Sequence, residues 1–390
     1  MILTKSQEEA VRICKTRYQH REPYTIIVGY AGSGKSTLIP VVVDALGLNS
    51  MTEVAYIAYT GKAALVMANR GCYDAQTAHR LLYKSVPQAN GTFKHIPKKF
   101  IGPYKLIIVD EVSMLPKDIW ELLLSHRIPV IAFGDPGQLP PVQAQDNGMM
   151  HKPDYFISEI VRQAQDNEII RLSMDVRQNK PLTLYKGEQI QIIDPEEVIP
   201  GMYTWADQII CAKNATRRQI NKDTRKLLYN VDSLEPLEGD KVICLNNYWE
   251  DINCIGDPLV NGTTGTVSFI RKFETKKLHP AMKLDILPDG FDIDCPLGDP
   301  YYSDVLIDYQ LLTTGVPTVN ESNWKKFRGE ARPREFDYGY AITAHKSQGS
   351  EYNKVLVFEE SFPYVEEEHA RWLYTAITRA KSRLVVVRQK

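Results

Sequence analysis

The sequence comprises 390 residues, which is long enough for two or three domains of ordinary size. Apolar residues make up 43% of it and charged residues 24%, which excludes wholesale disorder and fibrous architectures. The 47 Lys and Arg residues balance 48 Asp and Glu residues, which excludes binding to polyanions through bulk charge but leaves room for a local basic groove.

The cysteines and the amino-terminal segment indicate the compartment. Six cysteines are scattered without a Cys-x-x-Cys pair or zinc-type spacing, so we expect reduced thiols that mostly fill space in the core. Charged residues interrupt every apolar run near the amino terminus, and no stretch reaches the length of a membrane span. The sequence therefore predicts a soluble cytoplasmic protein.

The first half alternates short apolar segments with amphipathic ones. We expect strands at Tyr24–Val28, Val54–Ala58, Leu106–Val109 and Val130–Phe133, and helices at Thr37–Leu46, Gly61–Asn69 and Pro116–Ser125. This alternation predicts a parallel sheet with right-handed crossovers, whose binding crevice lies at the carboxyl ends of the strands.

The same alternation returns in the second half with interruptions. We expect strands at Gln208–Ala212, Asp240–Leu245, Lys354–Phe358 and Arg383–Val387, and helices at Asn214–Asn230 and Glu366–Ala380. We therefore predict an α/β protein with two parallel-sheet cores, residues 1–180 and 181–390, joined near residues 179–184. A hairpin insertion is expected at about 83–103, where Asn90-Gly91 is typical of a hairpin turn, and a small β-rich, SH3-like insertion at about 271–334.

A phosphate-binding loop is predicted at residues 29–36. They read Gly-Tyr-Ala-Gly-Ser-Gly-Lys-Ser and match G-x-x-x-x-G-K-[ST] between an apolar strand and a helix. Lys35 would neutralise the β- and γ-phosphates, and the Ser36 hydroxyl would coordinate Mg²⁺. Backbone amides of the loop and the helix start would hold the phosphate oxygens. The other residues expected at the nucleotide are Gly29, Ala31, Gly32, Ser33, Gly34 and Thr37. Pro40 lies inside the expected helix, and the sequence offers no reason for it.

Two further strand ends carry groups suited to the same chemistry. The strand Leu106–Val109 is followed by Asp110, which could hold Mg²⁺ through its hydration shell, and by Glu111, which could orient or deprotonate the attacking water. Gln138 follows the neighbouring strand and could reach a γ-phosphate or its water. The sequence thus predicts a site for ATP hydrolysis.

These segments, in this order, resemble motifs I, II and III of superfamily 1 helicases. The Asp-Glu-x-Ser-Met form at residues 110–114 resembles the RecD/Dda branch, whose members translocate 5′→3′ on single-stranded DNA. Residues 3–7 resemble the Q motif, 59–64 motif Ia, 77–79 motif Ib, 157–163 motif IV, 344–351 motif V and 374–380 motif VI. One departure is Tyr59, which stands where a proline is common before the motif Ia threonine.

The resemblance implies two RecA-like cores of the P-loop NTPase type and a DNA helicase that unwinds duplex, driven by Mg-ATP hydrolysis between the cores. It implies that Gln7 reads the adenine edge and that Gly349 and Glu351 contact the nucleotide. Arg162 and Arg379 would be arginine fingers, so that the site is complete only when the cores close on ATP. The resemblance also implies contacts to the DNA backbone from Thr60, Thr77, His79, Thr343 and His345.

The charge distribution suits a DNA groove. There is no carboxylate between Asp74 and Asp110 and none after Glu368, although both stretches carry several Lys and Arg residues. Phe93 in the hairpin insertion is a candidate wedge at the duplex fork, unless the insertion is a plain solvent hairpin. The tract Trp324–Arg334 would clamp the strand or bind a partner.

We therefore expect a DNA-associated, monomeric helicase of a bacterial or phage-infected cell, with ATP and Mg²⁺ as cofactors. Its partners would be single-stranded DNA, fork duplex and a replication or recombination protein, in replication, recombination or repair. Three alternatives remain open: a DNA-stimulated ATPase that remodels protein–DNA complexes, a nucleotide-dependent DNA-binding switch, and an RNA helicase of the same superfamily.

Overall fold

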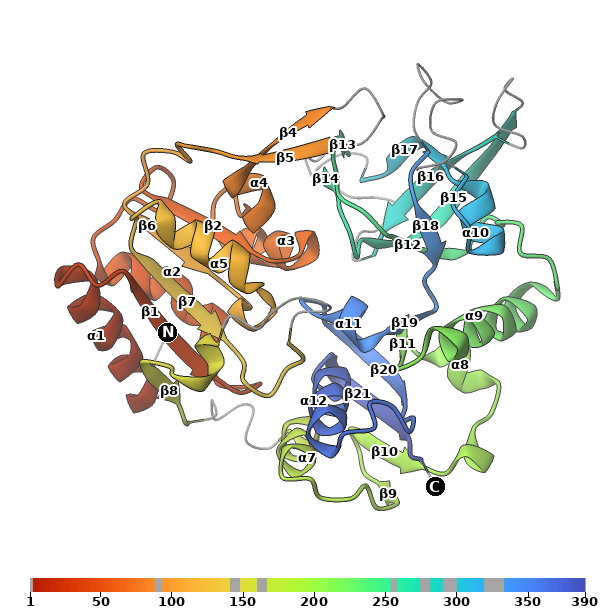
Figure 1. The fold of residues 1–390 in the computed structure, drawn as a ribbon. Coiled ribbons are helices and arrows are strands. Elements are labelled where there is room, and N and C mark those ends of the chain that lie inside the picture. Colours follow the sequence, from red (N-terminus) through yellow and green to blue (C-terminus); the bar gives the residue numbers. More distant parts are fainter. Residues whose placement is uncertain are drawn as a thin grey trace. The chain divides into compact units, whose positions relative to one another are not determined.

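The structure is a computed structural model that describes residues 3–87, 93–140, 148–159, 167–253, 258–273, 281–289, 300–318 and 333–389. It forms two compact units, each described separately below (Figure 1). The first unit comprises Met1–Lys84, Pro97–Lys213 and Thr343–Lys390, and the second comprises Ser85–Ile96 and Asn214–Ile342. In the part of the chain that the structure describes, no helix has the length and apolar character needed to cross a bilayer.

The first core is a six-stranded parallel sheet in the order β3-β2-β6-β7-β1-β8. Its strands are β1 (Tyr24–Gly29), β2 (Val54–Ala58), β3 (Gln76–Thr77), β6 (Leu106–Val109), β7 (Val130–Gly134) and β8 (Tyr155–Ile157). Its helices are α1 (Lys5–Gln19), α2 (Lys35–Ala45), α3 (Gly61–Asn69), α4 (Ala78–Leu82) and α5 (Lys117–Ser125), with 3₁₀ turns η1 (Val112–Met114) and η2 (Met149–His151). The strands and helices predicted for this half are confirmed within two residues.

Alternating strand residues bury both faces of this sheet. Ile27 of β1 lies in a cluster with α1, α2 and α3, whereas Ile26 and Val28 lie in a cluster with α4 and α5. Helices therefore cover both faces, and only the strand ends and the connecting loops can form a binding crevice.

The second core is also a mainly parallel sheet, in the order β19-β11-β20-β21-β10-β9, with β9 antiparallel. Its strands are β9 (Tyr185–Lys186), β10 (Ile190–Ile193), β11 (Gln208–Cys211), β19 (Ala341–Thr343), β20 (Tyr352–Phe358) and β21 (Ala380–Val387). Its helices are α7 (Glu168–Arg177), α8 (Gly201–Trp205), α11 (Ala344–Ser347) and α12 (Glu366–Ile377), with the 3₁₀ turn η3 (Pro195–Glu197). Apart from the start of β19, this core belongs to the first unit.

The second unit is built on a five-stranded antiparallel sheet in the order β17-β16-β15-β12-β18. Its strands are β12 (Lys241–Cys244), β15 (Thr264–Phe273), β16 (Ala281–Pro288), β17 (Tyr302–Ile307) and β18 (Phe336–Tyr338). The strand expected at Asp240–Leu245 is β12, so its assignment to the second parallel core was wrong. The predicted fold class, two parallel-sheet cores with a β-rich insertion, is confirmed, and the sheet of the insertion is antiparallel.

The second unit also contains the 16-residue helix α9 (Asn214–Tyr229) and three short elements, α10 (Tyr309–Thr314), β13 (Tyr248–Ile252) and β14 (Pro258–Leu259). β4 (Tyr83–Pro87) and β5 (Phe93–Pro97) form the two-stranded hairpin expected in the first half. The Asn90-Gly91 turn lies outside the described residues.

Candidate active site

The phosphate loop connects β1 to α2 and requires its glycines. Gly32 and Gly34 have φ values of 82° and 77°, in the left-handed region that favours glycine. A Cβ at Gly29 would lie 2.5 Å from the Ser33 hydroxyl oxygen, so a larger residue would displace the loop. Because α2 begins at Lys35, its first backbone amides are available to an anion at the carboxyl end of β1.

Lys35 lies at the centre of the site. Its Nζ donates hydrogen bonds to the carbonyl oxygens of Gly29 (2.6 Å) and Tyr30 (3.1 Å) and lies 3.8 Å from Asp135 Oδ2. The ammonium group is thus held between the phosphate loop and the end of β7. A phosphate bound in the loop would exchange these carbonyl contacts for a charge-assisted one.

Ser36 and Asp110 bring two oxygens together at the start of α2 and the end of β6. The Ser36 hydroxyl donates to Asp110 Oδ2 at 3.0 Å, and Asp110 Oδ1 accepts from the Glu111 amide at 2.9 Å. Burial raises the pKa of Asp110 above its ordinary value. Pro40 lies in α2 with its ring exposed, and its missing N–H removes the bond that the Ser36 carbonyl would otherwise accept within the helix.

Glu111 and Gln138 supply two buried oxygens without a hydrogen-bond partner among the described residues: Glu111 Oε2 and Gln138 Oε1. Glu111 has a left-handed backbone, with φ 54° and ψ 43°, which is unusual for a residue with a side chain. Burial, and next the charge of Asp110, raise the pKa of Glu111 to about 7 although Arg379 and Lys35 oppose the shift. Unpartnered buried oxygens and a carboxyl with a pKa near neutrality are typical of a catalytic base and of a second group that orients the attacking water.

One cavity of about 520 Å³ collects the residues of both cores, and all of its lining residues lie in the first unit. The residues that the sequence predicted and the cavity brings together are Ala31, Gly32, Gly34, Lys35, Ser36, Thr37, Asp110, Glu111, Gln138, Gly349, Glu351 and Arg379. Arg162 lies outside the described residues. The nucleotide-binding and catalytic roles of these residues remain predictions. The residues themselves line a single cavity.

Arg379 is buried at the end of α12 with its guanidinium held by its own core. It donates to the carbonyl oxygens of Thr375 (2.9 Å) and Ser350 (3.2 Å) and to the Thr378 hydroxyl (3.1 Å). These contacts fix the side chain in the cavity wall. There its positive charge opposes the rise in the pKa of Glu111. A preorganised cation of this kind can stabilise charge that develops on a transferring phosphoryl group.

Gly349 and Glu351 place the loop before β20 against the first core. A Cβ at Gly349, whose φ is 74°, would lie 2.8 Å from the Ala63 Cβ in α3. Glu351 pairs with Arg70 of the first core at 3.5 Å and with Lys381 of the second at 3.2 Å. Burial raises the pKa of Glu351, but the attraction of Arg70 and Lys381 outweighs it, so the pKa lies below its ordinary value.

The structure adds a pair that the sequence analysis missed, Asp135 of the loop after β7 and Tyr374 of α12. The buried Tyr374 hydroxyl donates to Asp135 Oδ2 at 2.8 Å and accepts from the Ala31 amide of the phosphate loop at 2.8 Å. Burial, and next Asp135, raise the pKa of Tyr374 well above its ordinary value, so it remains a donor. Both residues stand in recognised motifs, but a contact across 239 positions leaves no local pattern.

Two more bonds join the cores beside this pair. The Leu139 backbone amide donates to the Thr375 hydroxyl at 3.1 Å, and the side-chain Nε2 of Gln348 donates to the Leu139 carbonyl at 3.0 Å. In addition, the Arg177 guanidinium stacks on the Tyr30 ring with its carbon 3.0 Å from the ring centroid. The motif III segment and the phosphate loop are therefore tied directly to the second core.

Gln7 links α1 to the phosphate loop. Its Oε1 accepts from the Thr4 amide at 3.0 Å, and its Nε2 donates to the Ser33 carbonyl at 3.0 Å. In this position the side chain supports the loop, and the expected contact with adenine stays a prediction. The Thr37 hydroxyl donates to the Gly34 carbonyl at 2.6 Å and likewise stabilises the start of α2.

Several residues expected at DNA lie at helix starts. Thr60 and Thr77 cap α3 and α4, where their hydroxyl oxygens accept from the amides of Ala63 and Arg80, both at 3.2 Å. Thr60 is half-buried and Thr77 is buried, and the DNA contacts expected of both remain predictions. Their strands pair in register, Ala58 opposite Thr77, so both caps lie at one edge of the first sheet.

The remaining candidates at DNA are aromatic or lie in the second core. The His79 ring stacks on Tyr83, with centroids 5.7 Å apart, and the tilted ring of Tyr59 lies 5.9 Å away. Thr343 precedes α11 without capping it by its side chain, and burial lowers the pKa of His345, which keeps its imidazole neutral at pH 7. The side chain of Phe93 lies outside the described residues.

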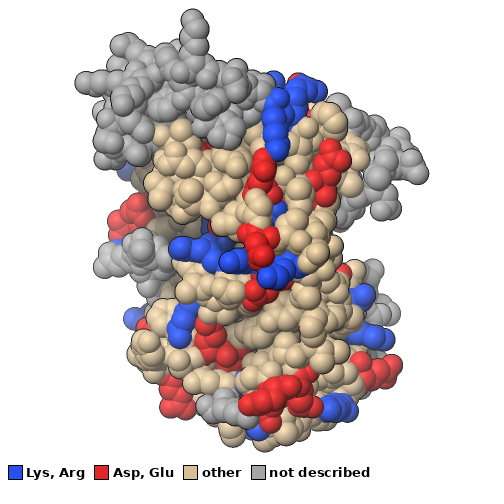
Figure 2. All heavy atoms as spheres, turned by 90° about the vertical axis from the view of Figure 1, so that its right-hand side faces the viewer, with Lys and Arg blue, Asp and Glu red and all other residues tan. Residues whose placement is uncertain are grey.

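Charges on the visible surface are mixed. On the face shown in Figure 2, Lys and Arg side chains alternate with Asp and Glu, without one large area of positive sign among the described residues. Of the tract Trp324–Arg334, residues 324–332 lie outside the described residues, and Arg334 forms a two-pronged ion pair with Asp251 at 2.6 and 2.9 Å. Arg334 therefore stabilises the second unit.

Comparison with known families agrees with this geometry. Residues 2–197 match the model of a family described as AAA domain, which covers half of the chain, and residues 338–387 match the UvrD-like helicase C-terminal domain. The chain belongs to the superfamily 1 DNA helicases of the RecD/Dda type. The family, the ATP-dependent helicase activity and the RecA-like character of the cores, as expected from the sequence, are thereby confirmed.

Individual relatives of the helicase show how far the likeness extends. The ATP-dependent DNA helicase dda of Enterobacteria phage T4 is 28% identical, over 97% of this chain and 98% of its own length. The ATP-dependent RecD2 DNA helicase of Deinococcus radiodurans is 27% identical over 96% of this chain but only 48% of its own. The helicase therefore matches the first relative along its whole length and about half of the second.

Solved structures share the fold of the helicase. Bacteroides Pif1 helicase in complex with ADP-AlF3 and ssDNA has a TM-score of 0.57 at 18% identity, covering 99% of this chain and 92% of that one. Candida albicans Pif1 helicase has a TM-score of 0.53 at 19% identity, covering 100% and 95%. At such identities the likeness concerns the fold alone.

Proposed function

We propose that this helicase hydrolyses ATP in the cavity described above and that hydrolysis drives it 5′→3′ along single-stranded DNA, unwinding the duplex ahead. One observation carries the proposal: a single cavity contains the phosphate loop, Glu111 and Gln138 of the first core together with Arg379 of the second. A site whose walls come from two cores changes shape when they move, which is what a motor requires.

The chemistry is divided among these residues. The γ-phosphorus is attacked by a water whose proton passes to Glu111 Oε2, the bond to the β-phosphate oxygen breaks, and ADP and phosphate leave. Gln138 Oε1 is placed to orient that water, since it has no hydrogen-bond partner among the described residues. Lys35 and Arg379 neutralise the charge that spreads over the phosphoryl oxygens.

Ser36 and Asp110 fit a magnesium ion. Both offer oxygen, the ligand type that Mg²⁺ prefers, and their oxygens are 3.0 Å apart in the cavity wall. No cluster of three or more His, Cys, Asp or Glu side chains suited to a metal occurs among the described residues, which suits an ion that keeps several waters. When bound, Mg²⁺ would offset the negative charge of the phosphate oxygens.

Tyr374 could couple nucleotide binding to movement of the two cores. Its hydroxyl joins the phosphate loop at Ala31 to Asp135 of motif III, and both lie on the first core while Tyr374 lies on the second. A γ-phosphate that takes over the Ala31 amide or moves Lys35 would change the contacts that hold the cores together. We propose that this exchange couples hydrolysis to opening and closing.

DNA would lie across the threonine caps at the carboxyl edge of the first sheet, with Thr343 and His345 contributing from the second core. Phe93 would act as the wedge at the fork. Bacteroides Pif1 has been solved bound to ssDNA, and two coordinating Pif1 helicases have been solved at forked dsDNA. These structures support single-stranded and forked DNA as partners of this helicase.

Tailed duplexes test the proposal. Substrates with a 5′ or a 3′ single-stranded tail, made of DNA or RNA, are mixed with the helicase, ATP and Mg²⁺, and strand separation is followed by fluorescence. We expect separation of the 5′-tailed DNA duplex alone, and none with Lys35→Ala. Separation of the 3′-tailed DNA duplex would contradict the polarity, and separation of RNA alone would contradict the substrate.

The same assay separates the alternatives. A remodelling ATPase would hydrolyse ATP with single-stranded DNA but leave every duplex intact. A nucleotide-dependent switch would bind DNA without sustained turnover, and the unpartnered oxygens of Glu111 and Gln138 argue against it, because a switch needs no prepared water site.

A further inference from the structure

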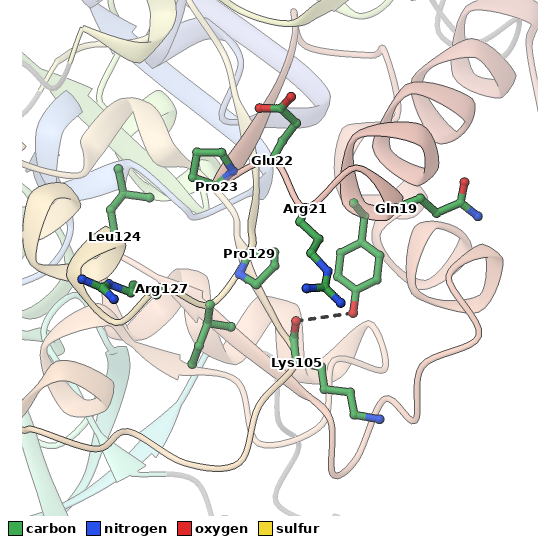
Figure 3. Close-up of a pocket in the computed structure, with 10 residues that line it drawn as sticks. Gln19, Arg21, Glu22, Pro23, Lys105, Leu124, Arg127 and Pro129 are labelled. Carbon is green, nitrogen blue, oxygen red and sulfur yellow. Dashed lines mark hydrogen bonds between the residues drawn. The ribbon is translucent and has the colours of Figure 1, made fainter.

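A second cavity lies at the amino-terminal ends of strands of the first sheet, away from the phosphate loop. Figure 3 shows the residues that line it. Its volume is about 650 Å³, and its lining includes Pro23, Lys105 and Pro129, which stand just before β1, β6 and β7. The phosphate loop follows the carboxyl end of β1, so the parallel sheet separates the two cavities. A molecule bound here would leave the ATP site free.

Two arginines line this cavity with an unfavourable backbone. Arg21 and Arg127 have φ values of 58° and 57°, and each stands two residues beyond the end of a helix, α1 or α5. Glycine or asparagine is preferred at such a position. The chain follows this rule after three other helices, at Gly47, Gly71 and Asn179, and Asn230 and Gly315 have left-handed backbones directly after two more. The two exceptions converge on one cavity, which points to a use for their side chains.

The helix dipole does not explain the choice. A cation is favoured near a helix C-terminus, but a Lys or Arg in the last turn serves that purpose without a left-handed backbone. Helix α1 already has such a residue, Arg17. Helix α5 has no Lys or Arg in its last turn, but one placed there would serve without the left-handed backbone that Arg127 adopts, so the dipole alone accounts for neither position.

Both guanidinium groups are available. Each residue is exposed, and neither has an ion pair or side-chain hydrogen bond to the described residues. The other charges of the cavity are already matched, since Lys105 pairs with Glu53 at 2.5 Å and Glu22 lies 3.9 Å from Arg17. The cavity thus presents two unmatched positive charges.

The surface between the arginines is largely apolar. Figure 3 shows Arg21 and Arg127 on opposite sides of Pro129, with Leu124 and Pro23 nearby. Tyr18, Ile128 and the polar Gln19 also line the cavity, and the Tyr18 hydroxyl donates to the Lys105 carbonyl at 3.5 Å. An occupant that matches this surface carries negative charge at two points and apolar groups between them.

We propose that this cavity binds an acidic peptide segment of a partner protein, whose carboxylates pair with Arg21 and Arg127 while an apolar or proline side chain covers Pro23 and Pro129. The planar guanidinium group binds a carboxylate through two parallel bonds. A nucleic-acid backbone fits this cavity less well. Its evenly spaced phosphates need more than two cations, and they do not use the apolar surface between the arginines. A partner bound here recruits the helicase without blocking ATP turnover.

A labelled peptide tests this site. The probe is a short fluorescein-labelled peptide with a central Leu-Pro pair flanked by glutamates, and binding to the full chain is measured by anisotropy at low salt. The variant Arg21→Asn/Arg127→Asn removes both charges and suits the left-handed backbone, so we expect unimpaired folding and an affinity at least about tenfold lower. Its DNA-independent ATP hydrolysis should equal that of the original chain.

Matched controls decide the outcome. Lys15→Gln/Lys152→Gln removes two exposed charges of the same core outside the cavity and should change the affinity by less than about twofold. A probe with glutamine in place of glutamate should not bind. Equal binding by the arginine variant, or by the glutamine probe, would overturn the proposal. Displacement of the probe by a dT oligonucleotide from the original chain would assign the cavity to nucleic acid instead. If the asparagine variant folds poorly, Arg21→Gly/Arg127→Gly repeats the test.

Discussion

The replacement Tyr374→Phe removes one oxygen from the junction between the cores and leaves the ring in place. Two bonds disappear with it: the one donated to Asp135 Oδ2 and the one accepted from the Ala31 amide, each 2.8 Å long. A buried hydrogen bond to a charged group contributes about 1.5–3 kcal/mol. A loss of about 2 kcal/mol from the closed state lowers its population about 30-fold relative to the open one.

We therefore expect the rate of ATP hydrolysis stimulated by single-stranded DNA to fall about 10- to 30-fold, with ADP affinity nearly unchanged. Steady-state phosphate release over a range of ATP and DNA concentrations measures this. Tyr338→Phe is the matched control, because Tyr338 is also buried and its hydroxyl donates to the Leu234 carbonyl at 2.6 Å, within the second unit. Normal turnover by Tyr374→Phe, or an equal loss in Tyr338→Phe, would refute the coupling role.

Three further predictions concern the same cavity. Arg379→Ala should preserve ATP binding and lower DNA-stimulated turnover by about 10³-fold or more, and unchanged turnover would remove its assignment as an arginine finger. Glu111→Gln should lower turnover by at least about 100-fold. In metal-free buffer Glu111→Gln should also change how stability depends on pH, because the folded pKa of Glu111, about 7, exceeds its ordinary value of 4.5. The free energy of unfolding of the original chain therefore falls by up to about 3 kcal/mol as pH rises from the ordinary to the folded pKa. That of the variant does not. Thermal unfolding at about pH 5 and pH 8 checks this, and parallel curves for both proteins would contradict the burial of that carboxyl. Gly349→Ala should destabilise the protein by about 1–3 kcal/mol more than Gly315→Ala. Both glycines have φ near 75°, but only at Gly349 would the added Cβ lie 2.8 Å from the Ala63 Cβ. Equal denaturation midpoints for the two variants would show that this contact does not form.

Local patterns made most of the site predictable. The phosphate loop needs a fixed series of glycines followed by Lys35 and Ser36, and Asp110 and Glu111 directly follow a buried strand. Each signal lies within a few residues, so a single sequence displays it. Arg379 was predicted only through the resemblance of motif VI, since nothing in its neighbours identifies it as part of an ATP site.

Long-range contacts were not predictable in the same way. The apolar run of β12 fits a parallel or an antiparallel sheet equally well, and its placement depends on pairing with β15 and β18. The Asp135–Tyr374 bond and the stacking of Arg177 on Tyr30 join segments far apart in sequence. The left-handed backbones of Arg21 and Arg127 also escaped prediction, because arginine gives no sign of that conformation.

Closure of the two cores around the nucleotide is the central claim, and energy transfer between dyes at positions 117 and 188, one on each core, measures it directly. With ADP and aluminium fluoride we expect the transfer efficiency to change from its nucleotide-free value and to return when the nucleotide is removed. In Arg379→Ala and Tyr374→Phe this change should be much smaller. An efficiency that stays the same with and without nucleotide in the original chain would contradict the account.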